Sequence, residues 1–353
     1  MNPLRSSVCI AAPSLTALLL AGCGGGGGGN QQVLNDAQYE KESIVTVKAF
    51  IQKSLDDLTA AAAGIEMAAP APDADGWNAT ADKPAVDAMK AEWKKARVAY
   101  ESIEGAIAVV FPDLDVSTDA RYDDFLSTGP DEDLFDDSGV TGVHAIERIL
   151  WSDQIPAKVV AFESALKGYK KPAFPANATE ATEFKEKLCH RLTLDTQEMA
   201  TKFKGLALDA PSAYRGVIGS AHEQVEKIDK AATGEEESRY AQFTLADMRE
   251  NIGAARATYG AFQPWLVTKQ GGPEIDMKIL AAFAQLKASY DKLPGDSLPD
   301  VPEGWSSQPN EAMLASPFGE LFKVIKFNSD GAQAGSLVFE MNASATLLGI
   351  KAL

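Results

Sequence analysis

Apolar residues recur three and four positions apart along most of this chain of 353 residues, which is the spacing of one face of an α-helix. The clearest example spans residues 244–266, where six apolar side chains keep that spacing: Leu245, Met248, Ile252, Ala255, Tyr259 and Phe262. Residues 82–110 repeat it with a second row: Trp93, Ala96, Tyr100, Ile103 and Ile107. Both segments therefore predict long helices that bury one face in a bundle.

The same spacing predicts further helices over residues 33–69, 140–152, 156–168, 178–206, 211–231, 275–291 and 311–326. One candidate strand, GSLVFEM at 335–341, fits a helix equally well. The predicted fold is all-α. Because so many long helices exceed one four-helix bundle, two packed four-helix-bundle subdomains are the simplest arrangement. A boundary in the segment LALDAP gives one bundle over 31–207 and a second over 208–353.

Residues 1–22 have the pattern of a secretion signal: a basic start at Arg5, an apolar stretch, and small residues before Cys23. The Leu-Ala-Gly-Cys sequence that ends at Cys23 resembles the bacterial lipobox, in which the cysteine is acylated and becomes the new N-terminus. Residues 23–30 supply the lipidated cysteine and a glycine tether. We therefore expect an exported bacterial lipoprotein of the periplasm or cell envelope, anchored to a membrane through Cys23.

Acidic residues outnumber basic ones by 50 to 33, and the formal net charge is −17. This surplus argues against nucleic-acid binding, which needs a basic face, and it attracts cations. Cys9 leaves with the signal and Cys23 takes the lipid, so Cys189 has no intramolecular disulfide partner. We expect Cys189 to be a small buried hydrophobic residue.

His144 is one of three histidines, and it lies three positions before Glu147 in the helical segment GVHAIERILW. Residues at this spacing project from one face of a helix. The two side chains can form a structural pair, which is the commoner case, or half of a metal site. The motif alone leaves both interpretations open.

Glu101 and Glu104 repeat this spacing directly after the apolar residues Tyr100 and Ile103. A Glu-x-x-Glu pair is usually a solvated helix face. At a half-buried position, however, two carboxylates one turn apart repel each other, and they need a cation or become partly protonated. Helix bundles that bind metals place Glu pairs opposite Glu-x-x-His motifs in the bundle interior.

The segments WKKARVAYESIE and TGVHAIERILW resemble hallmarks of the imelysin-like family, in particular its EfeO/EfeM branch of bacterial iron-uptake lipoproteins. The segments FPDLDVSTDARYDDF and TGEEESRYAQFTLADMRENIGAARATY are similar to further segments of that branch. The likeness extends from about residue 40 to residue 290. The cupredoxin domain of full-length EfeO has no counterpart here, so the expected form is the single-domain EfeM form.

This resemblance implies an all-α fold of two four-helix bundles with a metal-binding cleft near the His-x-x-Glu motif. Position by position, it implies a set of metal ligands: His144, Glu147, Glu101, Glu104, Asp119 and Glu226. One imidazole and several carboxylates suit a divalent or trivalent ion, with iron favoured and zinc or copper(II) compatible. The implied function is iron uptake by a monomer that captures the ion and delivers it to an inner-membrane permease, with a haem peroxidase-like protein as a further partner.

Two other functions compete with metal capture. Imelysin is classed with metallopeptidases, but HAIER lacks the second histidine and the adjacent glutamate of a His-Glu-x-x-His zinc site. We therefore expect no enzymatic activity. The second alternative is a surface lipoprotein that binds acidic polysaccharide through exposed tryptophans, although the apolar pattern places Trp93 and Trp151 in the core.

Overall fold

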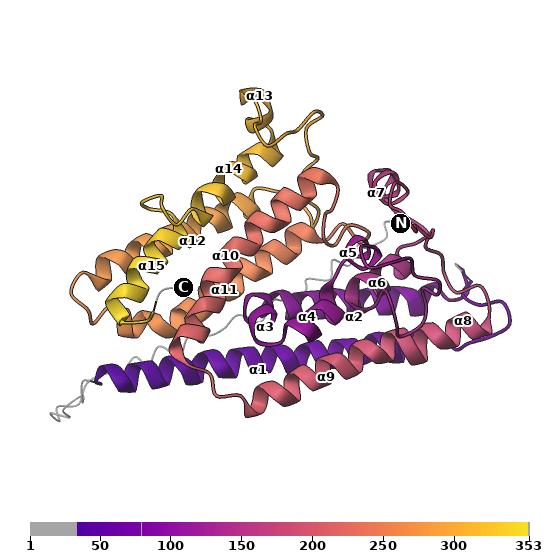
Figure 1. Cartoon of the computed structure of the whole chain (residues 1–353), viewed down its shortest axis with the longest axis horizontal. Coiled ribbons are helices and arrows are strands. Elements are labelled where there is room, and N and C mark those ends of the chain that lie inside the picture. Colours follow the sequence, from indigo (N-terminus) through magenta and orange to yellow (C-terminus); the bar gives the residue numbers. More distant parts are fainter. Residues whose placement is uncertain (1–33, 79, 352–353) are drawn as a thin grey trace, which may run out of the picture. The chain divides into compact units, whose positions relative to one another are not determined.

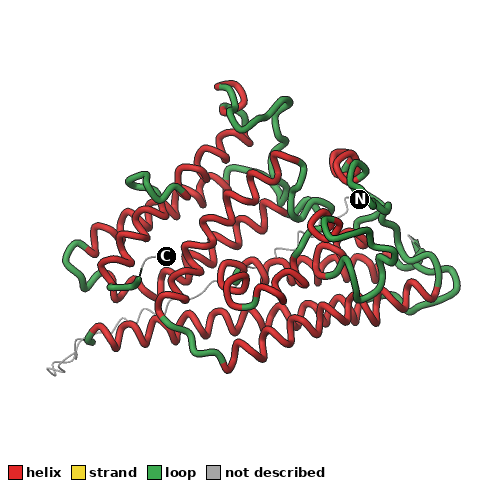
Figure 2. The backbone as a smooth tube through the Cα atoms, in the orientation of Figure 1, coloured by secondary structure: helices red, strands yellow, loops and turns green. Residues whose placement is uncertain are grey.

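The computed structural model describes residues 34–78 and 80–351, and the chain from Asn35 onward forms one compact unit. All regular structure within these ranges is helical (Figure 2), which confirms the all-α prediction. Residues 337–341 of the candidate strand lie in a helix that begins at Leu337. The predicted signal, lipid-bearing cysteine and glycine tether lie outside the described residues.

Fifteen α-helices and one π-helical turn, η1, follow one another along the described part of the chain (Figure 1): α1 (Asp36–Ala68), α2 (Lys83–Glu101), α3 (Glu104–Val110), α4 (Pro112–Asp119), α5 (Tyr122–Leu126), α6 (Gly142–Leu150), α7 (Ala157–Glu163), α8 (Ala178–Glu183), η1 (Phe184–Cys189), α9 (His190–Gly205), α10 (Ala210–Thr233), α11 (Thr244–Leu266), α12 (Gly272–Asp291), α13 (Glu311–Leu314), α14 (Pro317–Ser329) and α15 (Leu337–Leu348). None of these described helices combines the length and the apolar composition that crossing a membrane requires.

The helices pack in two groups that share one hydrophobic core (Figure 1). In the first group α1 runs along α2 and α9, and α6 packs on α2. In the second, α10, α11, α12, α14 and α15 pack on one another, and α10 and α11 also contact α1. The boundary that we predict near residue 207 falls between α9 and α10, and it stays a prediction.

Three residues confirm what the apolar pattern predicts about the core. Trp93 and Trp151 are both buried, with ring centroids 5.0 Å apart in an edge-to-face arrangement. Both are therefore packing residues rather than an exposed platform for sugars. Cys189 is fully buried as a free thiol.

The helix predicted over 82–110 is wrong in one respect, because it breaks after Glu101. Ile103, with a φ of −131°, separates α2 from α3. The break lets α3 pack closely on α10: a Cβ atom added at Gly105 would lie 2.6 Å from a backbone oxygen of α10. Only a residue without a side chain allows this approach. Glu101 consequently ends one helix and Glu104 begins the next, close to α10.

Candidate metal centre

The first turn of α6 holds His144 against the end of α4. Gly142 begins α6 with a φ of +85°, and a Cβ atom at this position would lie 2.4 Å from the Thr118 carbonyl oxygen. Glycine is therefore required here both for its backbone conformation and for the close approach. The indole N–H of Trp93 donates to the Val143 carbonyl at 2.8 Å and ties the same turn to α2.

The His144 ring is held from one side and left open on the other. Its Nδ1 lies 2.8 Å from Glu147 Oε2, in a fully buried pair. The other oxygen of Glu147 accepts hydrogen bonds from the backbone N–H groups of Tyr240, at 3.0 Å, and Ala241, at 2.7 Å. Both carboxylate oxygens of Glu147 are thus engaged by protein groups. Such a carboxylate fixes the orientation of an imidazole and supports its other nitrogen as a ligand.

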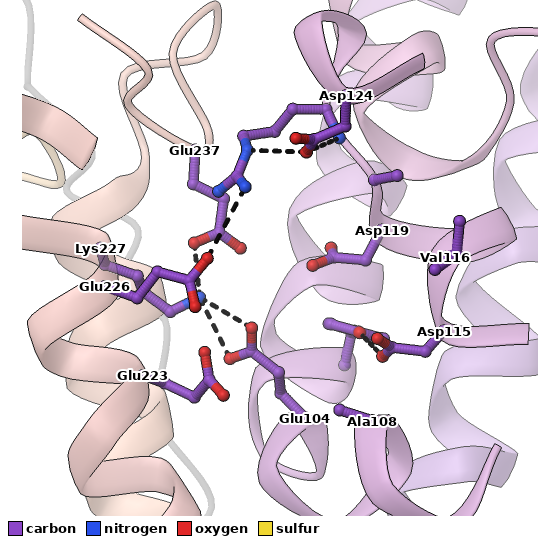
Figure 3. A pocket seen from close by; sticks show the side chains of 13 residues that line it. Glu104, Ala108, Asp115, Val116, Asp119, Asp124, Glu223, Glu226, Lys227 and Glu237 are labelled. Carbon is purple, nitrogen blue, oxygen red and sulfur yellow. Dashed lines mark hydrogen bonds and ion pairs between the residues drawn. The ribbon is translucent and has the colours of Figure 1, made fainter. Parts of the chain in front are cut away.

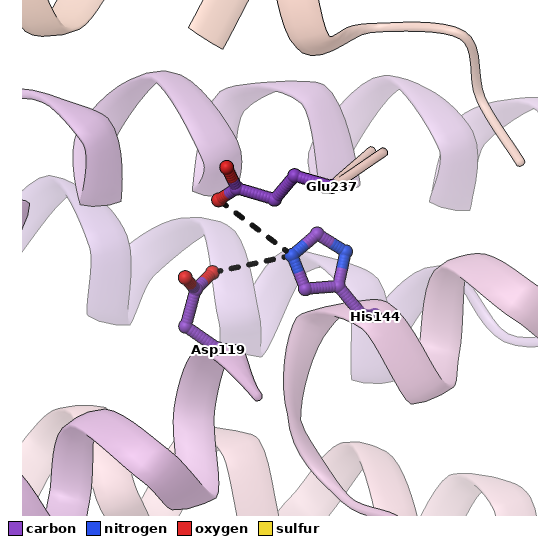
Figure 4. Close-up of side chains that lie close together, drawn as sticks. All are labelled: Asp119, His144 and Glu237. Atoms are coloured by element: carbon purple, nitrogen blue, oxygen red, sulfur yellow. Dashed lines mark ion pairs between the residues drawn. The ribbon is translucent and has the colours of Figure 1, made fainter. Parts of the chain in front are cut away.

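The open nitrogen of His144 points between two carboxylates (Figure 4). His144 Nε2 lies 3.4 Å from Asp119 Oδ1 and 4.0 Å from Glu237 Oε1. It is buried and has no hydrogen-bond partner among the described residues. The three side chains come from α6, α4 and the connection between α10 and α11, and one atom from each lies within 4.8 Å of the others. The two carboxylate oxygens that face His144 Nε2 also contact the Arg97 guanidinium.

Glu237 reaches the centre on a connection that is itself buried. Residues 236–239 lie in the connection between α10 and α11, and all four are less than a tenth exposed. Tyr240, the next residue, donates its hydroxyl to Glu163, and Arg148 Nε donates to the same carboxylate at 3.1 Å. The helix that carries His144 and the segment that carries Glu237 are therefore clamped together.

Arg97 is the main countercharge of the acidic cluster. Its guanidinium is fully buried and contacts four carboxylates: Glu101, Asp119, Glu237 at 2.8 Å and Asp247 at 3.3 Å. Arginine suits this role because its planar fork offers several donors at fixed angles. Asp119 and Glu237, which face His144, are therefore also held by Arg97.

Lys227 on α10 is a second buried cation. Its Nζ lies 3.2 Å from Glu101, 3.1 Å from Glu104 and 2.5 Å from Glu237. Glu101 and Glu104 do converge with Glu237, as atoms of all three lie within 4.8 Å. The cation that we expect between these carboxylates is supplied, however, by the protein itself.

A cavity of about 320 Å³ lies beside this cluster, and Glu104, Asp119, Lys227 and Glu237 reach its wall (Figure 3). Further acidic side chains on the wall come from α4, α5 and α10, and Arg121 lies among them: Asp115, Asp124, Glu223 and Glu226. A liquid water occupies roughly 30 Å³, so the space is large enough for an ion with its hydration shell.

Glu226 lies at this cavity but is not drawn into the cluster. Its side chain is 51% exposed, pairs with Lys230, and lies 3.7 Å from Arg121. His222, four residues earlier, is exposed. The structure therefore brings five of the six predicted ligands into one buried network and leaves Glu226 at its edge. Whether each of the six binds a metal stays a prediction.

The charges around His144 favour its protonated form when no metal is bound. Burial and the nearby Arg97 guanidinium lower the pKa of His144, but the carboxylates of Asp119 and Glu147 outweigh them and raise it to about 9. A metal ion at Nε2 must therefore displace a proton. The affinity for a metal should rise with pH for this reason.

These shifts predict that the metal-free protein loses stability as pH rises from about 6.5 to 9. The pKa of His144 rises from 6.5 to about 9, and burial raises that of Glu101 from 4.5 to about 8 against the pull of Lys227 and Arg97. Both groups bind protons more tightly in the folded state than in the unfolded state. Their contribution to the free energy of unfolding is therefore complete below the pKa of the unfolded state, and it is lost as pH rises through the pKa of the folded state. The slope should approach about 1.4 kcal/mol per pH unit for each proton.

Urea denaturation with a chelator present, at pH 6.5, 8 and 9, measures this slope, and His144→Gln should make it shallower. Glu237 has the opposite sign. Burial acts to raise its pKa, but Lys227 and Arg97 hold it well below its usual range, so its contribution disappears only in acid. Stability that stays flat between pH 6.5 and 9 would contradict the assigned directions.

The sequence interpretation missed the residues that neutralise and complete the cluster: Arg97, Lys227, Glu237 and Asp247. Arg97 and Glu237 lie in segments that carry the family resemblance, WKKARVAYESIE and TGEEESRY, so a signal was present. Each also belongs to a run of charged residues, which is typical of a solvated surface. Lys227 had no signal beyond its position next to Glu226.

Fold and site together define a helical protein with one histidine and several carboxylates buried beside an acidic cavity. The chain belongs to the imelysin family: the family model described as imelysin, or peptidase M75, matches residues 41–320. This confirms the family resemblance. The family name refers to a peptidase, whereas the relatives described next are named for iron uptake.

The curated relatives include the iron uptake system component EfeO of Yersinia pseudotuberculosis, 30% identical over 167 residues, which are 47% of this chain and 35% of the relative. The protein of the same name from Escherichia coli O1:K1 is 26% identical over 201 residues, covering 57% of this chain and 43% of the relative. The matches thus span less than half of each relative. A solved imelysin-like protein from Psychrobacter arcticum 273-4 shares the fold, with a TM-score of 0.52 and 11% identity over 90% of this chain and 98% of that one.

Proposed function

We propose that this protein captures an iron ion as cargo through His144, Asp119 and Glu237. The observation that carries the proposal is His144 Nε2, a buried nitrogen without a hydrogen-bond partner in the described structure that faces two carboxylates. One imidazole and two carboxylates are a hard-to-borderline donor set, which suits iron and also accepts zinc or copper(II). Glu147 then orients the imidazole, while Glu101 and Glu104 position Lys227 beside Glu237.

The cellular role that we propose is iron uptake by an exported, lipid-anchored protein that passes the ion to a membrane permease. The names of the EfeO relatives support the uptake role, and the lipobox at Cys23 supports the anchor. The acidic cavity supports the entry of a cation, because negative walls raise the local concentration of positive ions. Binding rather than hydrolysis is supported by the EfeO relatives, which are named as components of iron uptake systems.

Replacing His144 with alanine should weaken metal binding by at least about 10–100-fold, the loss usually seen when only an outer-shell partner is removed. Isothermal titration of the signal-less protein with ferrous iron under anaerobic conditions, and with zinc, measures the affinity. His190→Ala is the matched control, because His190 is 47% exposed and pairs with Glu66 at the surface. Equal affinities for wild type and His144→Ala would refute the site. Titration with oligouronates tests the polysaccharide alternative on the same samples.

A further inference from the structure

Lys227 places a buried positive charge beside the acidic cluster. Its side chain is 2% exposed, and its ammonium group contacts carboxylates from three elements: Glu101 at the end of α2, Glu104 at the start of α3, and Glu237 before α11. Burying an ammonium group is costly unless it is paired and hydrogen-bonded. Here the ammonium has three partners, so it acts as a cation held by the same kind of donors that hold a metal.

Glu237 connects Lys227 to the open nitrogen of His144. Its Oε1 faces His144 Nε2 at 4.0 Å, and its Oε2 lies 2.5 Å from Lys227 Nζ. A metal ion at His144 and the ammonium of Lys227 would therefore bind the two oxygens of one carboxylate, of which Oε1 also accepts a hydrogen bond from Arg97 at 2.8 Å. Two positive charges so close together repel each other strongly in a buried site.

The cavity provides space into which the ammonium group of Lys227 can move. Lys227 reaches the cavity wall, and further carboxylates line it, among them Asp115, Glu223 and Glu226 (Figure 3). Glu223 lies one helical turn before Lys227 on α10. Because lysine carries its charge on a flexible four-carbon stem, it can exchange one carboxylate for another. Arg97, held at four carboxylates by a planar fork, has no comparable freedom.

We propose that Lys227 is an internal competitor of the cargo for Glu237, which keeps the affinity low enough for the bound ion to be released. The inference rests on the proposed function, since it assumes a metal at His144. In the metal-free protein the ammonium group neutralises the carboxylates. When the ion arrives, Lys227 gives up Glu237 and turns toward the acidic cavity wall. The same group then returns when the ion leaves, so capture and release use one carboxylate.

Lys227→Met tests this role by keeping the length of the side chain and removing its charge. Metal affinity should increase by about tenfold or more, mainly through slower dissociation, because the repulsion between neighbouring charges is gone. Titration with zinc and ferrous iron gives the affinity, and stopped-flow mixing with a chelator gives the dissociation rate. Lys278→Met is the control: Lys278 is 47% exposed on α12 and pairs with Glu274, and neither residue lines the cavity. It should leave both quantities within about twofold of wild type.

A second variant keeps the inference testable if Lys227→Met does not fold. That substitution removes the ammonium group that contacts Glu101 and Glu104. Lys227→Met combined with Glu104→Gln removes the ammonium group together with the acidity of one carboxyl group that binds it, and it should still bind metal more tightly than wild type. Affinity at or below the wild-type value in both folded variants overturns the inference. If His144→Ala abolishes binding while these variants behave like wild type, only the role of Lys227 fails. If wild type itself binds no metal, the proposed function fails with it.

Discussion

Replacing Arg97 with methionine should lower the free energy of unfolding by about 3–5 kcal/mol at neutral pH, the usual cost of removing one partner from a buried ionic network. Arg97 is fully buried and touches Glu101, Asp119, Glu237 and Asp247. Without it, Lys227 is the one remaining permanent cation in contact with this cluster in the described structure, and it reaches only two of the four. The unpaired carboxylates must then stay buried as anions or take up protons.

Urea denaturation of Arg97→Met at pH 5 and pH 8 separates these outcomes. The decrease in the free energy of unfolding should be smaller at pH 5, because protonation removes the repulsion between the carboxylates. Lys53→Met is the matched control, since Lys53 is 74% exposed and pairs only with Asp57 on the surface of α1. Lys53→Met should lower the free energy of unfolding by less than about 1 kcal/mol. A comparable effect of the two substitutions would mean that Arg97 does not hold the cluster together.

Arg97 also shows where prediction from the sequence stops. The apolar spacing identifies α2 and α11 as helices and places Trp93 and Tyr100 inside, because each helix must bury one face. It says nothing about which charged residue a neighbouring helix brings to that face. Asp247 lies 150 positions after Arg97, and the pair exists only because α2 packs on α11.

The two candidate pairs illustrate the same limit at shorter range. Helical spacing correctly indicates that His144 and Glu147 face one way, and their side chains do meet. Helical spacing does not predict that Glu147 also accepts hydrogen bonds from the backbone N–H groups of residues 240 and 241. Those donors come from a connection without a periodic pattern. For Glu101 and Glu104, repulsion argues for a cation, but the pattern cannot distinguish a metal from Lys227.

Gly142→Ala should damage stability and metal binding together. Alanine at a φ of +85° costs about 1–3 kcal/mol in backbone strain alone. In addition, its Cβ would overlap the Thr118 carbonyl at 2.4 Å, so α6 must move away from α4. That movement separates His144 on α6 from Asp119 at the end of α4, now 3.4 Å apart. Metal affinity should fall by about tenfold or more, because a site tolerates displacements of only about 0.5 Å.

Gly253→Ala is the control that isolates the cause. Gly253 lies in the exposed interior of α11, and a Cβ atom there meets nothing within 4 Å. Alanine should raise stability at this position by about 0.5–1 kcal/mol, since glycine loses more backbone freedom in a helix. Thermal unfolding and metal titration of both variants give the comparison. Metal affinity unchanged in a folded Gly142→Ala protein would show that the contact between α4 and α6 does not set the distance between His144 and Asp119. The centre would then depend on Arg97 and Glu147 to hold these two side chains in place.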